Sequence, residues 1–211
     1  MDKPAKTKAT RGRPRAFDRE TALSQATHLF WLKGYGATSI ADLTETMGIG
    51  PPSLYAAFGS KEALYAEAID YYSKTYEGLL WSKFCTAPTA REAITALLVD
   101  SASVLTGSLI DIPRGCMVAL SSVASEGHIK LGERVRLARA TTCERIKARI
   151  NQAIREGELA PSTDAHALAR FVQTLQNGMS LLARDGVSRE ELAAVALIAM
   201  GGWDTHTATR I

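Results

Sequence analysis

Long hydrophobic segments are missing from this sequence. The longest uninterrupted apolar run, Leu192 to Met200, covers nine residues, whereas a helix that crosses a bilayer needs about 20. The first 16 residues are basic but carry no apolar stretch behind their charges, so they lack the pattern of a secretory signal peptide. We therefore expect a cytoplasmic protein with no membrane partner.

Cysteine is also scarce. Cys85, Cys116 and Cys143 are odd in number and widely spaced, which favours reduced thiols over a disulfide framework. We expect Cys116 and Cys143 to be buried, unreactive thiols. A response of Cys116 or Cys143 to oxidants is the alternative, since reactivity would require a lowered thiol pKa.

The motifs of common enzyme classes are absent. The four histidines form no HExxH pair, and there is no Walker A segment, no GxSxG and no CxxC. Gly34-Tyr35-Gly36 follows a predicted helix instead of a strand, which excludes a dinucleotide-binding fingerprint. Asp204 and His206 could touch a metal, but a frayed polar terminus is the simpler interpretation. We therefore expect no enzyme activity, no cofactor and no metal site.

Strand patterns are missing and proline is sparse. The seven prolines leave long spans rich in alanine, leucine, glutamate and arginine, the residues that lose least on entering a helix. With 211 residues, 46% of them apolar, the chain can form one ordinary domain or two small ones. The sequence predicts an all-α fold.

Positive charge is concentrated at one end. Residues 1–15 contain six bases and one acid, a net charge of +5, whereas residues 16–211 carry 19 bases and 21 acids, a net charge of −2. We predict a basic disordered arm over 1–15. Such an arm is typical of proteins that touch a polyanion, although a solvated tail has the same composition.

Three helices are predicted directly after the arm. The first runs from about 19 to 33 with Asp18 as its N-cap, and the second from about 39 to 46 with Thr38 as its N-cap. Gly48 supplies a tight turn, and the third begins at Pro51, where a proline costs little. Two short helices joined by a glycine turn and packed on a longer helix form a helix-turn-helix unit, here assigned to residues 16–62.

Longer helices are predicted over residues 63–211. They begin after Ser60, at a capping-box pattern formed by Thr89 and Glu92, near 116–124, and at about 130. The last two helices form an antiparallel hairpin around Asp185-Gly186. Their apolar stripes comprise Leu168, Val172, Leu175, Met179, Leu182, Leu192, Ala196, Ala199 and Trp203.

The third predicted helix has a face suited to a DNA groove. Leu54 and Phe58 lie one turn apart and are expected to point inward, which leaves short side chains on the outer side. Short side chains let a helix approach base edges, where the Ser53 hydroxyl could bond to a base or phosphate. The Tyr55 hydroxyl lies within plausible reach of a phosphate.

A distributed set of residues makes the sequence recognisable. The set consists of Gly34-Tyr35, Thr38-Ser39, Gly48-Ile49, Ser53-Leu54-Tyr55, Phe58 and Ser60-Lys61-Glu62-Ala63-Leu64. It resembles the N-terminal domain of the TetR family of transcriptional regulators, and a pattern of this extent is far more specific than a single short motif. The resemblance implies an all-α homodimer with an N-terminal helix-turn-helix DNA-binding domain and a helical ligand-binding and dimerisation domain over 63–211.

The resemblance also implies which residues meet DNA. Base-facing positions are Pro51, Pro52, Ser53 and Ala57, and phosphate-facing positions are Thr38, Ser39, Tyr55 and Lys61. Pro51 and Ala57 stand where members of the family often have hydrogen-bonding side chains, which weakens the case for direct base readout at these two positions.

This departure gives the arm more weight. Residues 16–70 contain three bases and seven acids, a net charge of −4, so counter-charge for DNA must come from elsewhere. Arg11-Gly12-Arg13-Pro14-Arg15 resembles an AT-hook core, whose arginines enter a narrow minor groove. Attraction of Arg11, Arg13 and Arg15 to phosphates alone is the alternative.

The second domain is expected to hold an apolar cavity for an unidentified small-molecule effector. Candidate lining residues are Trp81, Phe84, Leu97, Met117, Leu120, Arg139, Cys143 and Phe171. Ordinary core packing is the simpler interpretation of each apolar candidate, and a solvated helix face is the simpler interpretation of Arg139.

The two stripes of the last hairpin have two interpretations. They could form the core of one chain or pair two hairpins across a two-fold axis, and the resemblance favours the homodimer. We expect a ligand-responsive repressor of a palindromic operator. The alternatives are an activator of the same fold, or a helical interaction protein or enzyme that does not bind DNA.

Overall fold

A computed structural model describes residues 18–208 of the chain, with the side chain of Glu77 excepted. The described residues form eight α-helices and no strand, which confirms the predicted all-α fold. The helices are α1 (Arg19–Lys33), α2 (Ile40–Met47), α3 (Pro51–Phe58), α4 (Lys61–Thr86), α5 (Ala90–Leu105), α6 (Ile129–Arg155), α7 (Ala165–Arg184) and α8 (Arg189–Thr207).

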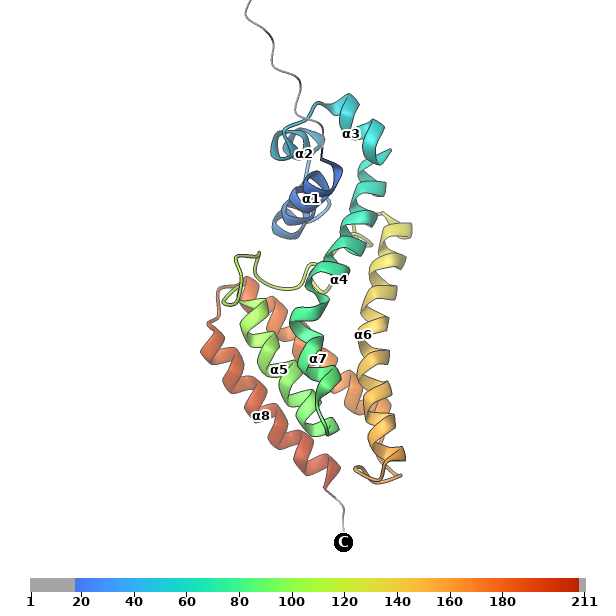
Figure 1. The fold of residues 1–211 in the computed structure, drawn as a ribbon, viewed down its shortest axis with the longest axis vertical. Helices are drawn as coiled ribbons and strands as arrows, with labels where there is room; N and C mark the ends of the chain where they lie inside the picture. Colours follow the sequence, from blue (N-terminus) through green and yellow to red (C-terminus); the bar gives the residue numbers. More distant parts are fainter. Residues whose placement is uncertain (1–17, 209–211) are drawn as a thin grey trace, which may run out of the picture.

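Helices α1, α2 and α3 form a small unit at one end of the elongated molecule (Figure 1). The Asp18 side chain caps α1 by accepting from the amides of Glu20 and Thr21. Gly48 ends α2 in the left-handed region, at φ 64°, a conformation that glycine adopts without steric cost. The inward faces of the three helices bury Phe30, Leu43, Leu54 and Phe58 in one cluster, which continues into α4.

The cap of α2 differs from the prediction. Ser39, not Thr38, is the N-cap, and it exchanges hydrogen bonds with Asp42 in a capping box. Thr38 is fully buried, and its hydroxyl donates to the Gly34 carbonyl at 2.6 Å. Two adjacent hydroxyl residues both fit the pattern of a cap, and only the path of the chain decides which of them lies outside the helix.

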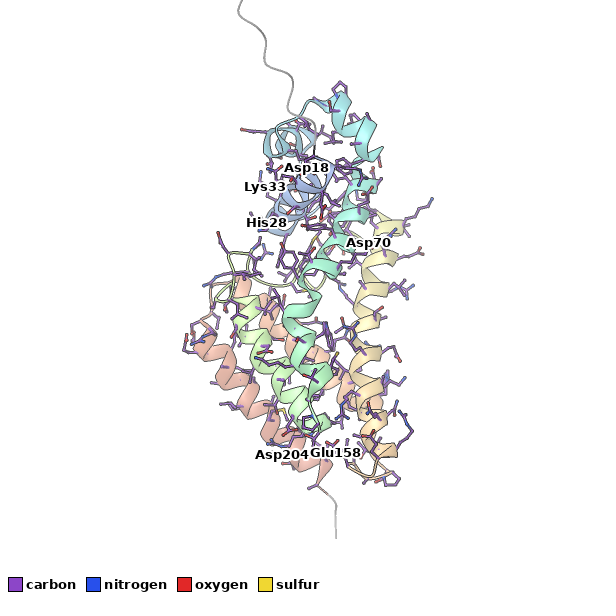
Figure 2. The ribbon with its side chains drawn as sticks, viewed as in Figure 1. Asp18, His28, Lys33, Asp70, Glu158 and Asp204 are labelled. Carbon is purple, nitrogen blue, oxygen red and sulfur yellow. The ribbon has the colours of Figure 1, made fainter. Side chains whose placement is uncertain are left out.

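Helix α4 joins the N-terminal unit to the rest of the molecule and lies beside α6 over part of its length (Figure 1). Asp70 on α4 accepts from Arg134 on α6 at 2.8 Å (Figure 2). Because α4 begins at Lys61, the predicted domain boundary at 62/63 falls inside its first turn. One continuous helix therefore belongs to both parts of the chain.

The remaining helices form the body of the molecule around a second buried cluster, drawn from α5, α6, α7 and α8 together with Phe84 of α4. Helices α7 and α8 form the predicted antiparallel hairpin, and Ser188 with Glu191 makes the capping box that opens α8. At the far end from α3, Arg91 of α5 pairs with Asp204 of α8 at 2.6 Å, and Glu158 accepts from the Ala90 amide at 2.7 Å (Figure 2).

Residues 106–128, here named the central loop, contradict one prediction. A helix is predicted near 116–124, but the structure has turns and irregular backbone there. The physical reason is tertiary, because the carbonyls of Val118, Ala119 and Ser121 accept hydrogen bonds from the Arg139 guanidinium of α6. Within residues 18–208, no helix is long and apolar enough to cross a membrane.

Candidate nucleic-acid interface and internal cavity

The outer face of α3 is exposed and carries no charge. Pro51, Pro52, Ser53 and Tyr55 are all exposed, and α3 has no acidic residue in its first turn and no basic residue in its last. Ala57 is half-buried against the N-terminal cluster, and its carbonyl accepts from Arg19 at 3.3 Å. The face can therefore approach a surface closely, with the Ser53 and Tyr55 hydroxyls as its polar side-chain groups.

The basic side chains of the N-terminal unit are engaged within the protein. Arg19 forms an ion pair with Glu67 at 2.7 Å, and Lys33 forms one with Asp42 at 2.7 Å. The Lys33 ammonium and the Ser39 hydroxyl hold the pKa of the Asp42 carboxyl well below its usual range. These cations are therefore largely neutralised by carboxylates, as the net negative charge of residues 16–70 suggested.

Lys61 occupies a different position, at the start of α4. Its ammonium lies 4.2 Å from the centre of the Tyr35 ring, and partial burial lowers its pKa. Ser39 is exposed, whereas Thr38 is buried with its hydroxyl already used. Of the predicted phosphate-facing side chains, Ser39, Tyr55 and Lys61 therefore keep access to solvent. Arg11, Arg13 and Arg15 lie outside the described residues.

A partly enclosed cavity of about 290 Å³ lies among the helices of the body, and Trp31 of α1 contributes to its wall. Its walls come from α1, α4, α5, α6, α7 and the central loop. Aromatic rings are prominent, and the lining includes Trp31, Tyr72, Tyr76, Trp81, Cys116, Arg139, Arg145, Gln173, Gln176 and Asn177.

The candidate ligand-binding residues divide into two groups. Trp81 and Arg139 line the cavity. Phe84, Leu97 and Cys143 are instead buried in the cluster of the body, and Met117 is buried in the other cluster. Leu120 is half-buried, and Phe171 is 38% exposed on α7.

Sequence reasoning missed most of the cavity lining. Tyr72 and Tyr76 lie one turn apart on α4, and Trp31 belongs to the N-terminal unit. The Tyr72 hydroxyl donates to the Cys116 sulfur at 3.3 Å, and burial raises the pKa of Tyr72. The cluster of tyrosines along α4 was visible in the sequence, but its partners lie on segments that only the fold brings together.

The two stripes of the α7–α8 hairpin face inward. Val172, Met179, Leu192, Ala196, Ala199 and Trp203 are buried in the protomer, and Leu168 and Leu175 are half-buried against the same cluster. Of the predicted interface residues, Leu182 is the one that is more than one-third exposed, at 41%. The stripes therefore form the core of a single chain. The large apolar side chains left exposed on this hairpin are Phe171, Leu181, Leu182, Val195, Leu197 and Ile198.

Two contacts connect the cavity and the body to α1. The Trp31 indole, which lines the cavity, donates to the Gly115 carbonyl at 2.9 Å. Arg184, the last residue of α7, donates to the carbonyls of Trp31 and Leu32 at 2.8 and 3.0 Å. These carbonyls lie in the last turn of α1, where backbone acceptors lack partners within the helix.

Comparison with known proteins agrees with this arrangement. Residues 22–68 match the model described as bacterial regulatory proteins, tetR family, and residues 92–196 match a tetracyclin repressor-like C-terminal domain. The chain belongs to the TetR family. This TetR-family protein is a DNA-binding transcriptional regulator, with an N-terminal helix-turn-helix domain and a helical C-terminal domain.

Two relatives of this TetR-family regulator come from Escherichia coli. The HTH-type transcriptional repressor ComR is 33% identical over 198 residues, which cover 93% of each chain. The HTH-type transcriptional repressor BdcR is 32% identical over 190 residues, which cover 89% of this chain and 90% of BdcR.

A solved structure with the same fold contains DNA. It is a cysteine mutant of the TetR family transcriptional regulator CifR, complexed with 26-bp double-strand operator DNA. The two chains superpose with a TM-score of 0.83 at 40% identity, covering 90% of this chain and all of the CifR chain.

Proposed function

We propose that this regulator is a repressor that binds a palindromic operator as a homodimer and is released by a small molecule. The observation that carries the proposal is the exposed, uncharged face of α3 at the end of a helix-turn-helix unit. The similarity of the chain to two named repressors, ComR and BdcR, supports repression over activation. The protein would act by binding DNA and the small molecule, not by catalysis. It would do so in the cytoplasm.

Base recognition would use the exposed side chains of α3. Ser53 would bond to a base or phosphate, while the apolar groups of Pro51, Pro52 and the half-buried Ala57 would meet thymine methyls. Tyr55, Ser39 and Lys61 would contact phosphates. Since α3 has no charged residue at its ends, the bases of residues 1–15 would supply most of the attraction to the DNA backbone.

Dimerisation would use the outer face of the α7–α8 hairpin. Phe171, Leu182, Val195 and Ile198 are exposed there, with Ile198 at 77%, and clustered exposed apolar side chains mark interaction surfaces. A Cβ added at Gly178 or Gly201 would meet no other atom within 4 Å in the described protomer, so a partner helix has room to approach there. Two copies of α3 would then meet successive major-groove faces.

Release would proceed by a shift between two orientations of the N-terminal unit. A molecule in the cavity touches Trp31, which belongs to α1, and Tyr72, which belongs to α4. The bound molecule would favour a conformer in which the two α3 helices are wrongly spaced for the operator. The loss of operator affinity would be set by the difference between the molecule's affinities for the two conformers.

Selection from a random double-stranded library at low salt tests the proposal. We expect the full chain to enrich an inverted repeat and to form a discrete complex that contains two chains per duplex. The variant with both Ser53→Ala and Tyr55→Phe serves as the matched control and should enrich the repeat weakly. If the full chain enriches no sequence, the proposal is wrong.

A reporter assay separates repression from activation. The enriched repeat is placed over the promoter of a reporter gene, and expression is measured with and without the protein. Repression predicts lower expression when the protein is present. Higher expression would show that the protein is an activator of the same fold.

A further inference from the structure

We propose that the cavity binds a planar aromatic carboxylate of one or two rings. The inference deepens the proposed function, and it rests on that function only for its consequence at the operator. Binding itself can be measured without DNA. Four features of the cavity support the inference: its rings, its cations, the fixed position of Arg139, and its size.

Aromatic rings form one wall of the cavity. The rings of Trp31 and Tyr72 meet edge to face with centroids 4.8 Å apart, and those of Trp31 and Tyr76 meet in the same way at 5.3 Å. Tyr72 and Tyr76 are tilted against each other at 5.5 Å. Rings at these spacings offer both faces and edges to a planar ligand, which gains contact area and favourable quadrupole geometry there.

The charged side chains that line the cavity are cations. Among the described lining residues, Arg139 and Arg145 are basic and none is a carboxylate. The guanidinium of Arg145 lies 4.6 Å from the centre of the Trp81 ring, at another part of the wall. A cationic ligand would meet like charge in this cavity, whereas an anion would meet opposite charge.

Backbone carbonyls hold Arg139 in place, and no described carboxylate pairs with it. Its Nε donates to the Val118 carbonyl at 3.0 Å, and one terminal nitrogen donates to the carbonyls of Ala119 and Ser121 at 3.0 and 2.7 Å. Within residues 18–208 it forms no ion pair with a described carboxylate, and its other terminal nitrogen, Nη1, forms no hydrogen bond to a described residue.

This geometry prepares Arg139 for an anionic ligand. Because three carbonyls fix the guanidinium plane, the Arg139 side chain would lose little entropy when a carboxylate binds at Nη1. The carboxylate would gain a charge-assisted hydrogen bond to a half-buried cation that has no other anionic partner in the described chain. Arg139 would therefore determine the preference for an anion.

The size of the cavity limits the ligand. A volume of about 290 Å³ lies at the lower end of the range for small-molecule sites. One or two fused rings with a single carboxylate fit this volume. The Tyr76 hydroxyl, which has no hydrogen-bond partner among the described residues, can serve a second polar group of the ligand.

Calorimetric titration of the full chain with three matched probes tests the inference. The probes are 2-naphthoate, its neutral amide, and the corresponding naphthylmethylammonium. We expect 2-naphthoate to bind about tenfold to a hundredfold more tightly than the amide, the range expected for one charged hydrogen bond, and the ammonium probe to bind most weakly. Equal binding of the three probes, or binding of none, would overturn the inference.

Variants assign the preference to particular residues. Arg139→Gln should remove the preference for the carboxylate over the amide, while Arg136→Gln, at an exposed position three residues earlier on α6 and outside the cavity lining, should keep it. Tyr76→Leu should weaken 2-naphthoate and the amide alike. If Arg139→Gln does not fold, the titrations of the native chain with the three probes still show whether the cavity prefers a carboxylate.

The outcome can be distinguished from failure of the proposed function. Binding of 2-naphthoate by a chain that enriches no DNA sequence would support this inference while disproving the proposed function. A chain that enriches an inverted repeat but ignores all three probes would support the proposed function and overturn this inference.

Discussion

The N-terminal unit and the cavity differ in how far apart their residues lie in the sequence. The outward face of α3 comes from eight consecutive residues, whose helix begins at a proline and ends before Gly59. The cavity draws Trp31 from α1, Tyr72 from α4, Arg139 from α6 and Gln173 from α7. The outward face of α3 is thus a local property of the chain, whereas the cavity is a property of helix packing, and changes in the two regions should have different consequences.

The largest expected effect comes from the outer face of the α7–α8 hairpin. Ile198→Glu places a charge where a partner helix would pack but leaves the core of the protomer intact, since Ile198 is 77% exposed. We expect a monomer in sedimentation and a loss of operator affinity of about a hundredfold or more, because two linked half-site contacts become one. Leu137→Glu, an equally apolar exposed position on α6, is the control. A dimeric Ile198→Glu protein would show that the partner binds elsewhere.

The next effect tests whether the local face of α3 suffices without the arm. Deletion of residues 1–15 removes six bases. It should reduce the slope of log affinity against log salt by up to about 5 for each of the two arms of the dimer, at roughly 0.9 for each phosphate that an arm no longer neutralises. The measurement is a salt titration of operator binding by the full and shortened chains. An unchanged slope would mean that the arm does not touch DNA.

Substitutions on α3 separate base readout from phosphate contact. Ser53→Ala should weaken operator binding by roughly 1 to 3 kcal/mol and leave binding to random DNA unchanged if the hydroxyl meets a base. Tyr55→Phe should weaken both by a similar factor. Competition assays with operator and random duplexes measure the difference. A Ser53→Ala protein that loses both affinities equally would place this hydroxyl on a phosphate.

Arg184 links the two regions directly. Its side chain donates to the last turn of α1 from the end of α7, and burial lowers its pKa. Arg184→Met removes these hydrogen bonds, each of which contributes about 1 kcal/mol. We expect faster hydrogen–deuterium exchange in the last turn of α1. Exchange should stay normal in Arg189→Met, whose arginine pairs with its neighbour Glu190. Unchanged exchange in Arg184→Met would show that Arg184 does not hold the last turn of α1 in place.

The smallest effect concerns the pH dependence of the N-terminal unit. Because Lys33 and Ser39 hold the pKa of Asp42 below its usual range, the stabilisation from this carboxylate is present above the unfolded pKa, about 3.9, and is lost as pH falls through the folded value. The stability difference between native chain and Asp42→Asn should therefore shrink in acid. Denaturant titrations at several pH values measure it, with Glu45→Gln as a control on the same helix. A difference that does not depend on pH would rule out the carboxylate as its source.

Caps and turns could be predicted from the sequence because they depend on neighbouring residues. Asp18 caps α1, and Thr89 with Glu92 forms the capping box that opens α5, as the patterns indicated. The choice of Ser39 over Thr38 required the path of the chain, since both residues can cap a helix. The wrongly predicted helix near 116–124 also depended on the path of the chain. Arg139, on the distant helix α6, donates hydrogen bonds to the backbone carbonyls of this segment.

The hairpin shows a second limit of periodicity. The spacing of Leu168, Val172, Leu175 and Met179 predicted one apolar stripe, and that stripe forms the core of the protomer. Exposed apolar residues such as Leu181, Leu182 and Ile198 accompany it. When two sides of a helix are apolar, periodicity cannot decide which side turns inward, because each satisfies the same spacing.

The sequence by itself determined the helical class, the helix-turn-helix unit, the composition of its outer face and the basic character of residues 1–15, since each depends on residues that are neighbours along the chain. Tertiary structure alone decided which rings surround the cavity, why Arg139 lines it without a carboxylate partner among the described residues, and which side of the α7–α8 hairpin remains exposed. These features arise where helices distant in sequence pack together, and no local pattern encodes which residues will meet there.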